Sequence, residues 1–301
     1  MLRILVPGKT GQVGWELQSA LAPLGAVIAL DRSGMDLANP DSIRRVIREL
    51  KPGIIVNAAG YTFVDKAESE PELAMQVNGV APGIIAEEAK RLGAILIHYS
   101  TDYVFDGELD RPYVEDDPTN PLSAYGRGKL AGEQAIRESS ATHLIFRTSW
   151  VYAARGHNFL RTILKLARER TELRIVDDQI GAPTWARAIA EITAQVLATN
   201  SGNLDKLREK SGLYHLTAAG ATSWFGFAGA ILAEAKGTLG KDLPRLIPIP
   251  TSEYPLPARR PANSRLDNSK LVQTFGLTPP SWEAMLTACM QDMQAETGNR
   301  K

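Results

Sequence analysis

Cysteine and histidine are scarce in this chain of 301 residues, and their scarcity argues against two kinds of chemistry. Cys289 is the only cysteine, so no intramolecular disulfide can form, and we expect it to be an unreactive residue of a helix. The four histidines are scattered along the sequence without the close spacing of metal ligands. We therefore expect no catalytic metal.

An excess of charge of one sign is also lacking, because 34 basic residues balance 34 acidic ones. Without a net positive field we expect no affinity for nucleic acid or for an anionic membrane surface. No run of eighteen apolar residues occurs, and the first residues lead into a strand-like segment rather than a signal peptide. We expect a soluble, cytoplasmic protein.

Apolar runs of strand type alternate with amphipathic stretches through the first half of the chain. The runs are apolar throughout rather than alternating, which is typical of parallel strands covered on both faces by helices. This order predicts an α/β fold of the Rossmann type, with a doubly wound parallel sheet and ligands at the carboxyl ends of the strands. The expected strands are Leu2–Val6, Val27–Asp31, Ile54–Asn57, Ile95–Ser100 and Leu144–Arg147, and the expected helices are Gly11–Leu24, Pro40–Leu50, Pro71–Leu92 and Ala124–Ser139.

The pattern changes near Trp150, where turn residues become denser and the strand-like runs shorter. We expect residues 1–150 to form a dinucleotide-binding domain and residues 151–301 a smaller α/β lobe that binds substrate and interleaves with the first domain. Its expected strands are Leu173–Val176, Leu213–Leu216 and Arg245–Ile249, and its expected helices are Phe159–Arg170, Trp185–Ala198, Ser223–Ala235 and Trp282–Met293. The proline-rich stretch Pro248–Pro261 is expected to be an ordered, irregular loop.

A glycine-rich turn follows the first expected strand and opens the first expected helix. Its glycines, Gly8, Gly11 and Gly14, permit a tight turn and let the backbone approach a pyrophosphate at the helix N-terminus. Asp31 ends the second strand twenty residues after Gly11, where a carboxylate can accept the ribose hydroxyls of NAD. Arg32 follows directly and can pair with the 2′-phosphate of NADP. The sequence therefore predicts a nicotinamide cofactor and leaves NADH or NADPH open.

Tyr125 and Lys129 are spaced to share one face of a helix, a turn apart. A phenol beside an ammonium is expected to have a pKa below its ordinary value of about 10 and to exchange a proton with an alcohol oxygen. Thr101, after the fourth strand, can donate a hydrogen bond to a substrate oxygen, and Lys129 can hold the nicotinamide ribose. We predict that these three residues are catalytic, whereas His98 is expected to be a hydrogen-bonded core histidine.

Several longer motifs of the sequence resemble those of a known enzyme family. The chain resembles the extended short-chain dehydrogenase/reductase superfamily and, within it, the dTDP-4-dehydrorhamnose reductase family. The resemblance covers nearly the whole sequence. Its segments are Gly8–Leu17, Val56–Pro71, Tyr99–Gly107, Arg147–Tyr152, Asp178–Thr184 and Arg260–Leu266.

This resemblance implies NAD(P)H-dependent reduction of the C4 ketone of dTDP-4-dehydro-L-rhamnose to dTDP-L-rhamnose, with Tyr125 as the proton donor. The implied cofactor contacts are Gly11, Gln12, Val13, Asp31, Asp36, Leu37, Ala59, Tyr61, Tyr99, Tyr125 and Lys129. The implied contacts to the sugar nucleotide are Thr101, Asp102 and Trp150, with Val64 and Tyr103 nearby. From the chemistry of guanidinium we add Arg259 or Arg260 as a partner of the diphosphate, with a plain surface role as the alternative.

Many bacterial members of the family dimerise around Mg²⁺ through glutamates. Glu16 and Glu283 stand in matching sequence contexts, and Glu191 matches less well. The resemblance therefore implies a homodimer with a structural, non-catalytic Mg²⁺, against the simpler alternative of exposed helix glutamates.

Two other functions compete with reduction. A sugar-nucleotide epimerase or dehydratase would use the same fold, but a dehydratase needs an Asp-Glu pair after the threonine, and here Asp102-Tyr103 follows Thr101. A non-catalytic dinucleotide-binding regulator, such as the regulatory subunit of methionine adenosyltransferase, would not need an intact Thr101, Tyr125 and Lys129. The absence of a Gly-x-Ser-x-Gly elbow and of a P-loop argues against the common hydrolase and kinase functions.

Overall fold

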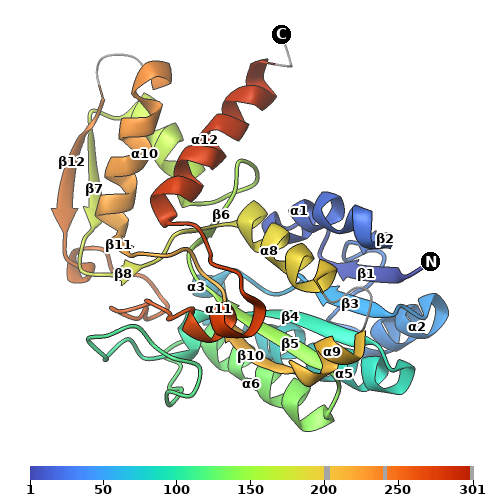
Figure 1. Cartoon of the computed structure of the whole chain (residues 1–301). Coiled ribbons are helices and arrows are strands. Elements are labelled where there is room, and N and C mark those ends of the chain that lie inside the picture. Colours follow the sequence, from blue (N-terminus) through green and yellow to red (C-terminus); the bar gives the residue numbers. More distant parts are fainter. Residues whose placement is uncertain (200–203, 240–242, 299–301) are drawn as a thin grey trace.

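A parallel sheet of six strands forms the centre of the molecule, which is a computed structural model that describes residues 1–199, 204–239 and 243–298 (Figure 1). The strand order is β10-β5-β4-β3-β1-β2, and every neighbouring pair is parallel. The predicted Rossmann-type sheet is thereby confirmed. The strands are β1 (Arg3–Pro7), β2 (Ala26–Leu30), β3 (Ile54–Asn57), β4 (Ile95–Thr101), β5 (His143–Thr148) and β10 (Gly212–His215).

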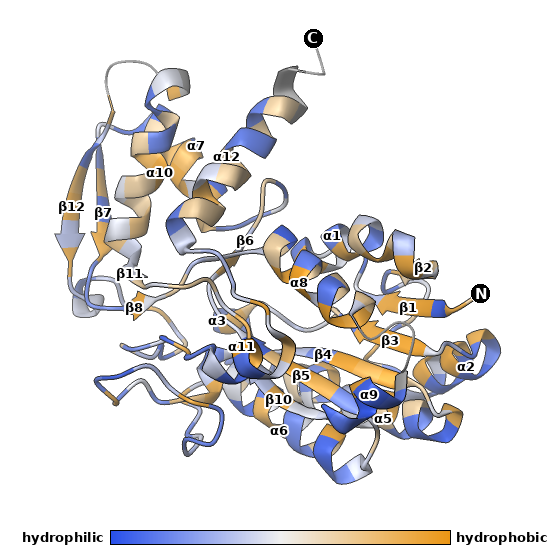
Figure 2. Cartoon of the chain, viewed as in Figure 1, coloured by the Kyte–Doolittle hydropathy of each residue, from blue (hydrophilic) through white to orange (hydrophobic). Residues whose placement is uncertain are grey.

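Helices cover both faces of this sheet (Figure 1). α1 (Gln12–Leu21) and α8 (Ala186–Ala198) pack on one face, while α2 (Pro40–Leu50), α5 (Ala81–Leu92) and α6 (Ala124–Ser139) cover the other. Figure 2 shows the strands as an apolar layer between helices whose outer faces are more polar. None of the described helices is long and apolar enough to cross a membrane.

β1 shows why the strands are apolar throughout. Ile4 and Val6 point into the core shared with α1 and α8, whereas Leu5 points into the opposite core, with α2 and α5. All three side chains are completely buried. Because successive side chains of a strand alternate between faces, a sheet covered twice needs apolar residues at every position.

The expected helix Pro71–Leu92 contains a local irregularity. It consists of α4 (Pro71–Met75), a π-helical turn η2 (Gln76–Val80) and α5. Pro82, in the first turn of α5, has no N–H to bond the carbonyl four residues earlier, which accounts for the widened turn. The side chain of Asn78, within η2, binds the backbone N–H and carbonyl of Tyr61 and so positions the loop after β3.

A second core lies in the C-terminal part of the chain, where α7 (Phe159–Glu169), α10 (Trp224–Leu239) and α12 (Trp282–Gly298) pack around it. β7 (Glu172–Val176) pairs in parallel with β12 (Arg245–Ile249) beside this core (Figure 1). Cys289 is buried in α12, as expected of a helix residue. The remaining elements are β6 (Val151–Tyr152), β8 (Ile180–Gly181), β9 (Thr184–Trp185), β11 (Thr222–Ser223), α3 (Val64–Ala67), α9 (Leu204–Glu209) and α11 (Ser269–Phe275).

Residues after position 150 also contribute to the main sheet. β10 forms its edge beside β5, and α8 packs on α1. The expected strand Arg245–Ile249 is confirmed as β12, which includes the first two residues of Pro248–Pro261; after it, Thr251–Glu253 forms a turn of 3₁₀ helix. The first residues of this proline-rich segment belong to a strand because β7 pairs with them in parallel.

Candidate active site

The carboxyl ends of the parallel strands carry the glycine turn predicted to hold a dinucleotide. Gly8 has φ of +92°, and a Cβ on it would lie 2.7 Å from the backbone carbon of Ala58. A Cβ on Gly14 would lie 2.1 Å from the carbonyl oxygen of Gly8. Only glycine fits at either position, so the turn after β1 is held tightly against the end of β3.

The N-terminus of α1 opens directly from this turn. Gly11 is its N-cap residue and offers no side chain to the free N–H groups of the first turn. These groups and the helix dipole favour an anion such as a pyrophosphate. The amide of Gln12 accepts a hydrogen bond from Asn158 Nδ2 at 2.9 Å and donates one to the carbonyl of Val151 at 3.3 Å, which links the turn to the second lobe.

Asp31 follows the end of β2 and carries an organised carboxylate. Its oxygens accept hydrogen bonds from the Ser33 hydroxyl and pair with the ammonium of Lys9 at 3.0 Å, and these contacts lower its pKa. The neighbouring Arg32 side chain is 76% exposed and pairs with Asp36 at 3.3 Å. An anionic acceptor and an accessible guanidinium therefore stand side by side. The residues of this edge fit the adenosine half of a dinucleotide.

Other predicted cofactor contacts differ in accessibility. Leu37 is buried in the core, and the Tyr99 side chain also points inward, where its hydroxyl lies 2.8 Å from that of Thr193. Ala59 and Val13 are half-buried near the turn, and the hydroxyl of Tyr61 donates to Glu70 Oε2 at 2.7 Å. Contact of these residues with a dinucleotide stays a prediction.

Thr101 and Asp102 stand where β4 ends and a short 3₁₀ helix, η3 (Asp102–Val104), begins. The Thr101 hydroxyl donates to Asp102 Oδ1 at 2.9 Å and accepts from the backbone N–H of Tyr103 at 3.2 Å. Both residues are buried, and among the described residues Asp102 Oδ2 has no hydrogen-bond partner. Burial raises the pKa of Asp102 to about 6, although hydrogen bonds with Ser264 and Thr101 oppose this rise. Asp102 thus places a buried carboxylate at the carboxyl edge of the sheet, next to the hydroxyl of Thr101.

Tyr125 occupies the first turn of α6, which begins after the capping side chain of Ser123. Its ring stands edge-on to that of Tyr103, with centroids 5.8 Å apart. Burial and the nearby charge of Asp102 raise the pKa of Tyr125 to about 12, while a hydrogen bond with Thr101 lowers it. The expectation of a lowered pKa was therefore wrong for this arrangement.

The reason is the position of Lys129. Its ammonium donates to the backbone carbonyl of Tyr99 at 2.5 Å and lies 3.2 Å from Nε2 of His98. Burial lowers the pKa of Lys129 to about 8, and Glu133, one turn further along α6, opposes this decrease. Sequence spacing placed Tyr125 and Lys129 on one helix, but it did not show which groups would compete for the ammonium.

Trp150 lies just after β5, with the strained backbone value φ of +48°. Its indole stacks on Trp224 with centroids 3.5 Å apart, and Gly181 leaves the room that the ring needs on that side. Phe159 packs against Trp224 in turn, at 4.6 Å. These aromatic rings connect the carboxyl end of the sheet with the second lobe.

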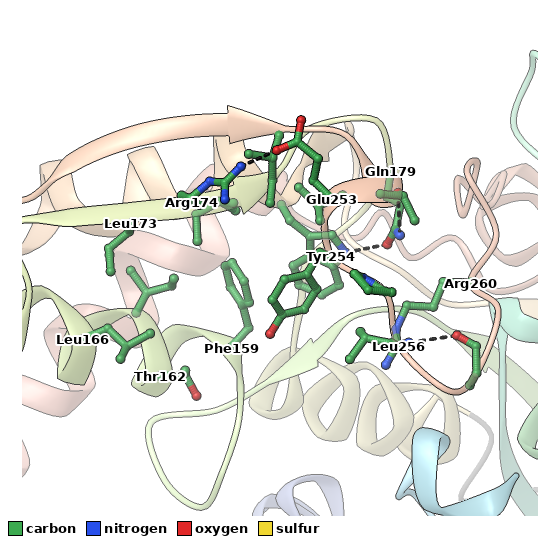
Figure 3. A pocket seen from close by; sticks show the side chains of 18 of the residues that line it. Phe159, Thr162, Leu166, Leu173, Arg174, Gln179, Glu253, Tyr254, Leu256 and Arg260 are labelled. Atoms are coloured by element: carbon green, nitrogen blue, oxygen red, sulfur yellow. Dashed lines mark hydrogen bonds and ion pairs between the residues drawn. The ribbon is translucent and has the colours of Figure 1, made fainter.

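A cavity of about 950 Å³ opens beside this aromatic group, between α7, the β7–β12 pair and the segment after β12 (Figure 3). Phe159, Trp224 and Tyr254 contribute apolar surface, and Gln179 contributes polar groups. Sequence reasoning missed this cavity, because its walls come from separate segments that only the parallel pairing of β7 with β12 brings together.

Arg259 and Arg260 both line the cavity, but their environments differ. Arg260 forms two hydrogen bonds with the carboxylate of Asp65, at 2.7 and 3.1 Å, and its side chain is only 17% exposed. Arg259 is exposed. Arg260 thus ties α3, which Val64 begins, to the second lobe, and Arg259 is the residue available to a ligand.

The glutamates that the family resemblance connected with Mg²⁺ do not form a metal site in the part of the chain that the structure describes. Glu16, one of the two glutamates, instead forms an ion pair with Arg187 at 3.0 Å, and Arg187 also pairs with Asp292 at 2.8 Å. No group of three or more acidic, histidine or cysteine residues within 1–199, 204–239 and 243–298 could hold a metal ion. Dimerisation stays a prediction.

Comparison with known proteins places this geometry in context. The family model described as RmlD substrate binding domain matches residues 2–295. A dTDP-4-dehydrorhamnose reductase of Burkholderia thailandensis is 51% identical over 298 residues, covering 98% of this chain and 100% of the relative. The enzyme of the same description from Escherichia coli K12 is 48% identical over 301 residues, covering 98% and 99% of the two chains.

Solved structures agree with these matches. A dTDP-4-dehydrorhamnose reductase of Clostridium acetobutylicum superposes with a TM-score of 0.89 at 35% identity, covering 97% of this chain and 100% of its own. The corresponding structure from Bacillus anthracis, in complex with NADP, has a TM-score of 0.85 at 34% identity and the same coverage. A UDP-glucose 4-epimerase of Thermus thermophilus, at 18% identity and a TM-score of 0.79, shares the fold.

Proposed function

Because the chain belongs to the dTDP-4-dehydrorhamnose reductase family, we propose that its site reduces the C4 ketone of dTDP-4-dehydro-L-rhamnose to the alcohol of dTDP-L-rhamnose. NAD(P)H, when bound, supplies the hydride that forms the new C–H bond at C4. The assignment of roles is supported by the hydrogen bond between Tyr125 and Thr101, because Thr101 ends β4 at the same edge of the sheet as the glycine turn after β1.

Tyr125 gives its phenol proton to the C4 oxygen as the C=O bond becomes a C–O bond. A raised pKa keeps this phenol protonated at neutral pH, so it is always ready to donate. Thr101 lies next to it and orients the same oxygen through its hydroxyl. Lys129, one turn further along α6, is assigned the support of the phenolate that Tyr125 becomes, although its ammonium here donates to the carbonyl of Tyr99.

The remainder of the substrate fits the cavity of the second lobe. We assign the sugar hydroxyls to Asp102 Oδ2, with Trp150, Val64 and Tyr103 around the ring. The nucleotide extends along Phe159, Trp224 and Tyr254, whose apolar surfaces suit a base, and Arg259 pairs with the diphosphate. Arg260 instead holds the wall of the cavity through Asp65.

The assay follows oxidation of NADH and of NADPH by the purified protein with dTDP-4-dehydro-L-rhamnose generated in the same mixture. We expect turnover that depends on the sugar nucleotide and yields dTDP-L-rhamnose with stoichiometric oxidised cofactor. Stoichiometric oxidation separates a reductase from an epimerase, which returns the hydride to its substrate. Dinucleotide binding without turnover would instead support the regulatory alternative.

Cofactor choice is decided at Arg32. We expect Arg32→Ala to weaken NADPH binding by about 10- to 100-fold, because a charge-assisted hydrogen bond to phosphate contributes roughly 1.5–3 kcal/mol. NADH binding should stay within about twofold, since Asp31 with its partner Lys9 remains. Fluorescence titration of both cofactors measures the effect, with the exposed Arg45→Ala as control. Equal weakening of the two cofactors would contradict a contact with the 2′-phosphate.

A further inference from the structure

Two buried polar side chains, Asn57 and His98, form a chain of contacts that ends at Lys129. Asn57, at the end of β3, stands beside His98 of β4, and its Nδ2 lies 3.1 Å from His98 Nδ1. On the other side of the imidazole, Nε2 lies 3.2 Å from Nζ of Lys129. Asn57 and His98 are each 1% exposed, so both side chains lie in the interior of the protein.

The backbone fixes which end of the Asn57 amide faces the histidine. Asn57 Oδ1 accepts a hydrogen bond from the N–H of Ala59 at 3.2 Å. A reversed amide would place its NH₂ group against this N–H, and two donors would face each other. Nδ2 therefore donates to His98, and Nδ1 of the imidazole is the acceptor.

This acceptor role determines where His98 carries its proton. Burial and the nearby charge of Lys129 lower the pKa of His98 well below its ordinary value, so the ring is neutral. A neutral imidazole has one N–H, which must then be on Nε2. The N–H at Nε2 points at Lys129 Nζ, where an ammonium has no lone pair to accept it but a neutral amine has one.

Two other groups favour the ammonium. The carbonyl of Tyr99 accepts from Nζ at 2.5 Å, and the carboxylate of Glu133 lies one helical turn away. Glu133 is itself held by two hydrogen bonds from Arg147 of β5 and one from Ser100 of β4. His98 is therefore the one group among these contacts that opposes the charge of Lys129.

We propose that Asn57 and His98 are positioning residues that hold the imidazole as its Nε2–H tautomer and thereby favour the neutral amine of Lys129. Burial lowers the pKa of Lys129 to about 8, and the Nε2–H of His98 acts in the same direction, so the charge of Lys129 is present below about pH 8 and lost above it. Loss of the charge removes the support of the Tyr125 phenolate, so turnover declines on the alkaline side. This last consequence rests on the proposed function, whereas the tautomer and the charge of Lys129 are properties of the chain alone.

Nuclear magnetic resonance of protein labelled with ¹³C in histidine and lysine side chains tests the proposal without turnover. We expect the His98 ring to report the Nε2–H tautomer from pH 5 to 9, a range chosen to span the ordinary histidine pKa of about 6.5. The His98 and Lys129 signals are assigned by their loss in His98→Leu and Lys129→Met. An Nδ1–H tautomer of His98 in the unaltered protein would overturn the proposal.

The direction in which the pKa of Lys129 changes in His98→Leu distinguishes this role of His98 from simple packing. Removing the opposing N–H should raise the pKa of Lys129 by about one pH unit, a tenfold change in proton affinity. The alkaline decline of kcat should move upward with it. If His98 instead accepted a hydrogen bond from the ammonium, His98→Leu should lower the pKa of Lys129, because the leucine leaves the lysine in a more apolar site.

Two further variants complete the experiment. His215→Leu removes another wholly buried histidine that has no hydrogen bond to Lys129, and it should leave the pKa of Lys129 unchanged. Asn57→Asp places an acceptor beside Nδ1 and should convert His98 to the Nδ1–H tautomer. A lysine pKa that is unchanged or lowered in His98→Leu, or an unchanged tautomer in Asn57→Asp, would contradict the proposal. If the tautomer is as expected but no sugar nucleotide is reduced, the proposed reaction is wrong, whereas the proposed effect of Asn57 and His98 on Lys129 is retained.

Discussion

Replacing Tyr125 with phenylalanine is expected to lower kcat for reduction of the sugar nucleotide by about 10²- to 10⁴-fold, the usual contribution of a general acid. The substitution removes only the hydroxyl. The ring can keep its edge-on packing with Tyr103 and its place in the first turn of α6. We therefore expect cofactor affinity and the free energy of unfolding to change little, and steady-state kinetics with a binding titration separate these quantities.

Tyr214→Phe is the matched control. Its ring packs among Phe146 and Phe275 in the core, and its hydroxyl donates to the carbonyl of Lys210 at 2.7 Å. This variant also loses one tyrosine hydroxyl, but that hydroxyl does not lie at the carboxyl edge of the sheet. We therefore expect kcat to be unchanged. A Tyr125→Phe protein that reduces the ketone at the normal rate would assign the proton to another donor.

The pH dependence of this reaction follows from the same residues. The pKa of Tyr125 is raised to about 12, so the phenol keeps its proton throughout the neutral range and does not limit reduction there. The pKa of Asp102 is raised to about 6, so this carboxylate becomes protonated below that pH and loses its charge. We expect the acid decline of kcat near pH 6 to disappear in Asp102→Asn, at a lower maximal rate.

The sheet and the glycine turn could be predicted because the signals are local. Continuous apolar strands such as β1 and β4 need cover on both faces, and Gly8 and Gly14 meet backbone atoms that leave no room for a Cβ. The edge strand β10 was expected only as a short, separate strand. Its place beside β5 depends on pairing between segments about seventy residues apart, which no local pattern records.

The catalytic group was only partly predictable for a related reason. The helical spacing of Tyr125 and Lys129 is a property of the sequence, but the direction of each pKa depends on burial and on neighbours from other strands. The carbonyl of Tyr99 draws the ammonium of Lys129 toward β4, where it lies beside His98, and Asp102 places negative charge near Tyr125. The cavity lined by Phe159, Trp224 and Tyr254 likewise arises from tertiary packing of distant segments.

The second large effect is expected on stability and concerns Arg147. This side chain and that of Glu133 are 3% and 2% exposed and form two hydrogen bonds, at 2.9 and 2.6 Å. They join β5 to α6, the helix that carries the predicted catalytic residues Tyr125 and Lys129, and Ser100 of β4 donates to the same carboxylate at 2.5 Å. Arg147→Met should reduce the free energy of unfolding by about 3–5 kcal/mol, because it leaves a buried carboxylate without its partner.

Urea denaturation of four proteins measures this effect and its origin: the unaltered chain, Arg147→Met, Glu133→Leu and the double variant. If the cost lies in the uncompensated charge, the double variant should recover much of the stability that either single variant loses, since an apolar pair of similar volume is often neutral. Arg45→Met, which breaks an exposed pair with Glu49 at 3.5 Å, should change the stability by less than about 1 kcal/mol. A double variant as unstable as the sum of the single ones would show that packing of the two long side chains, and not their charge, holds α6 on the sheet.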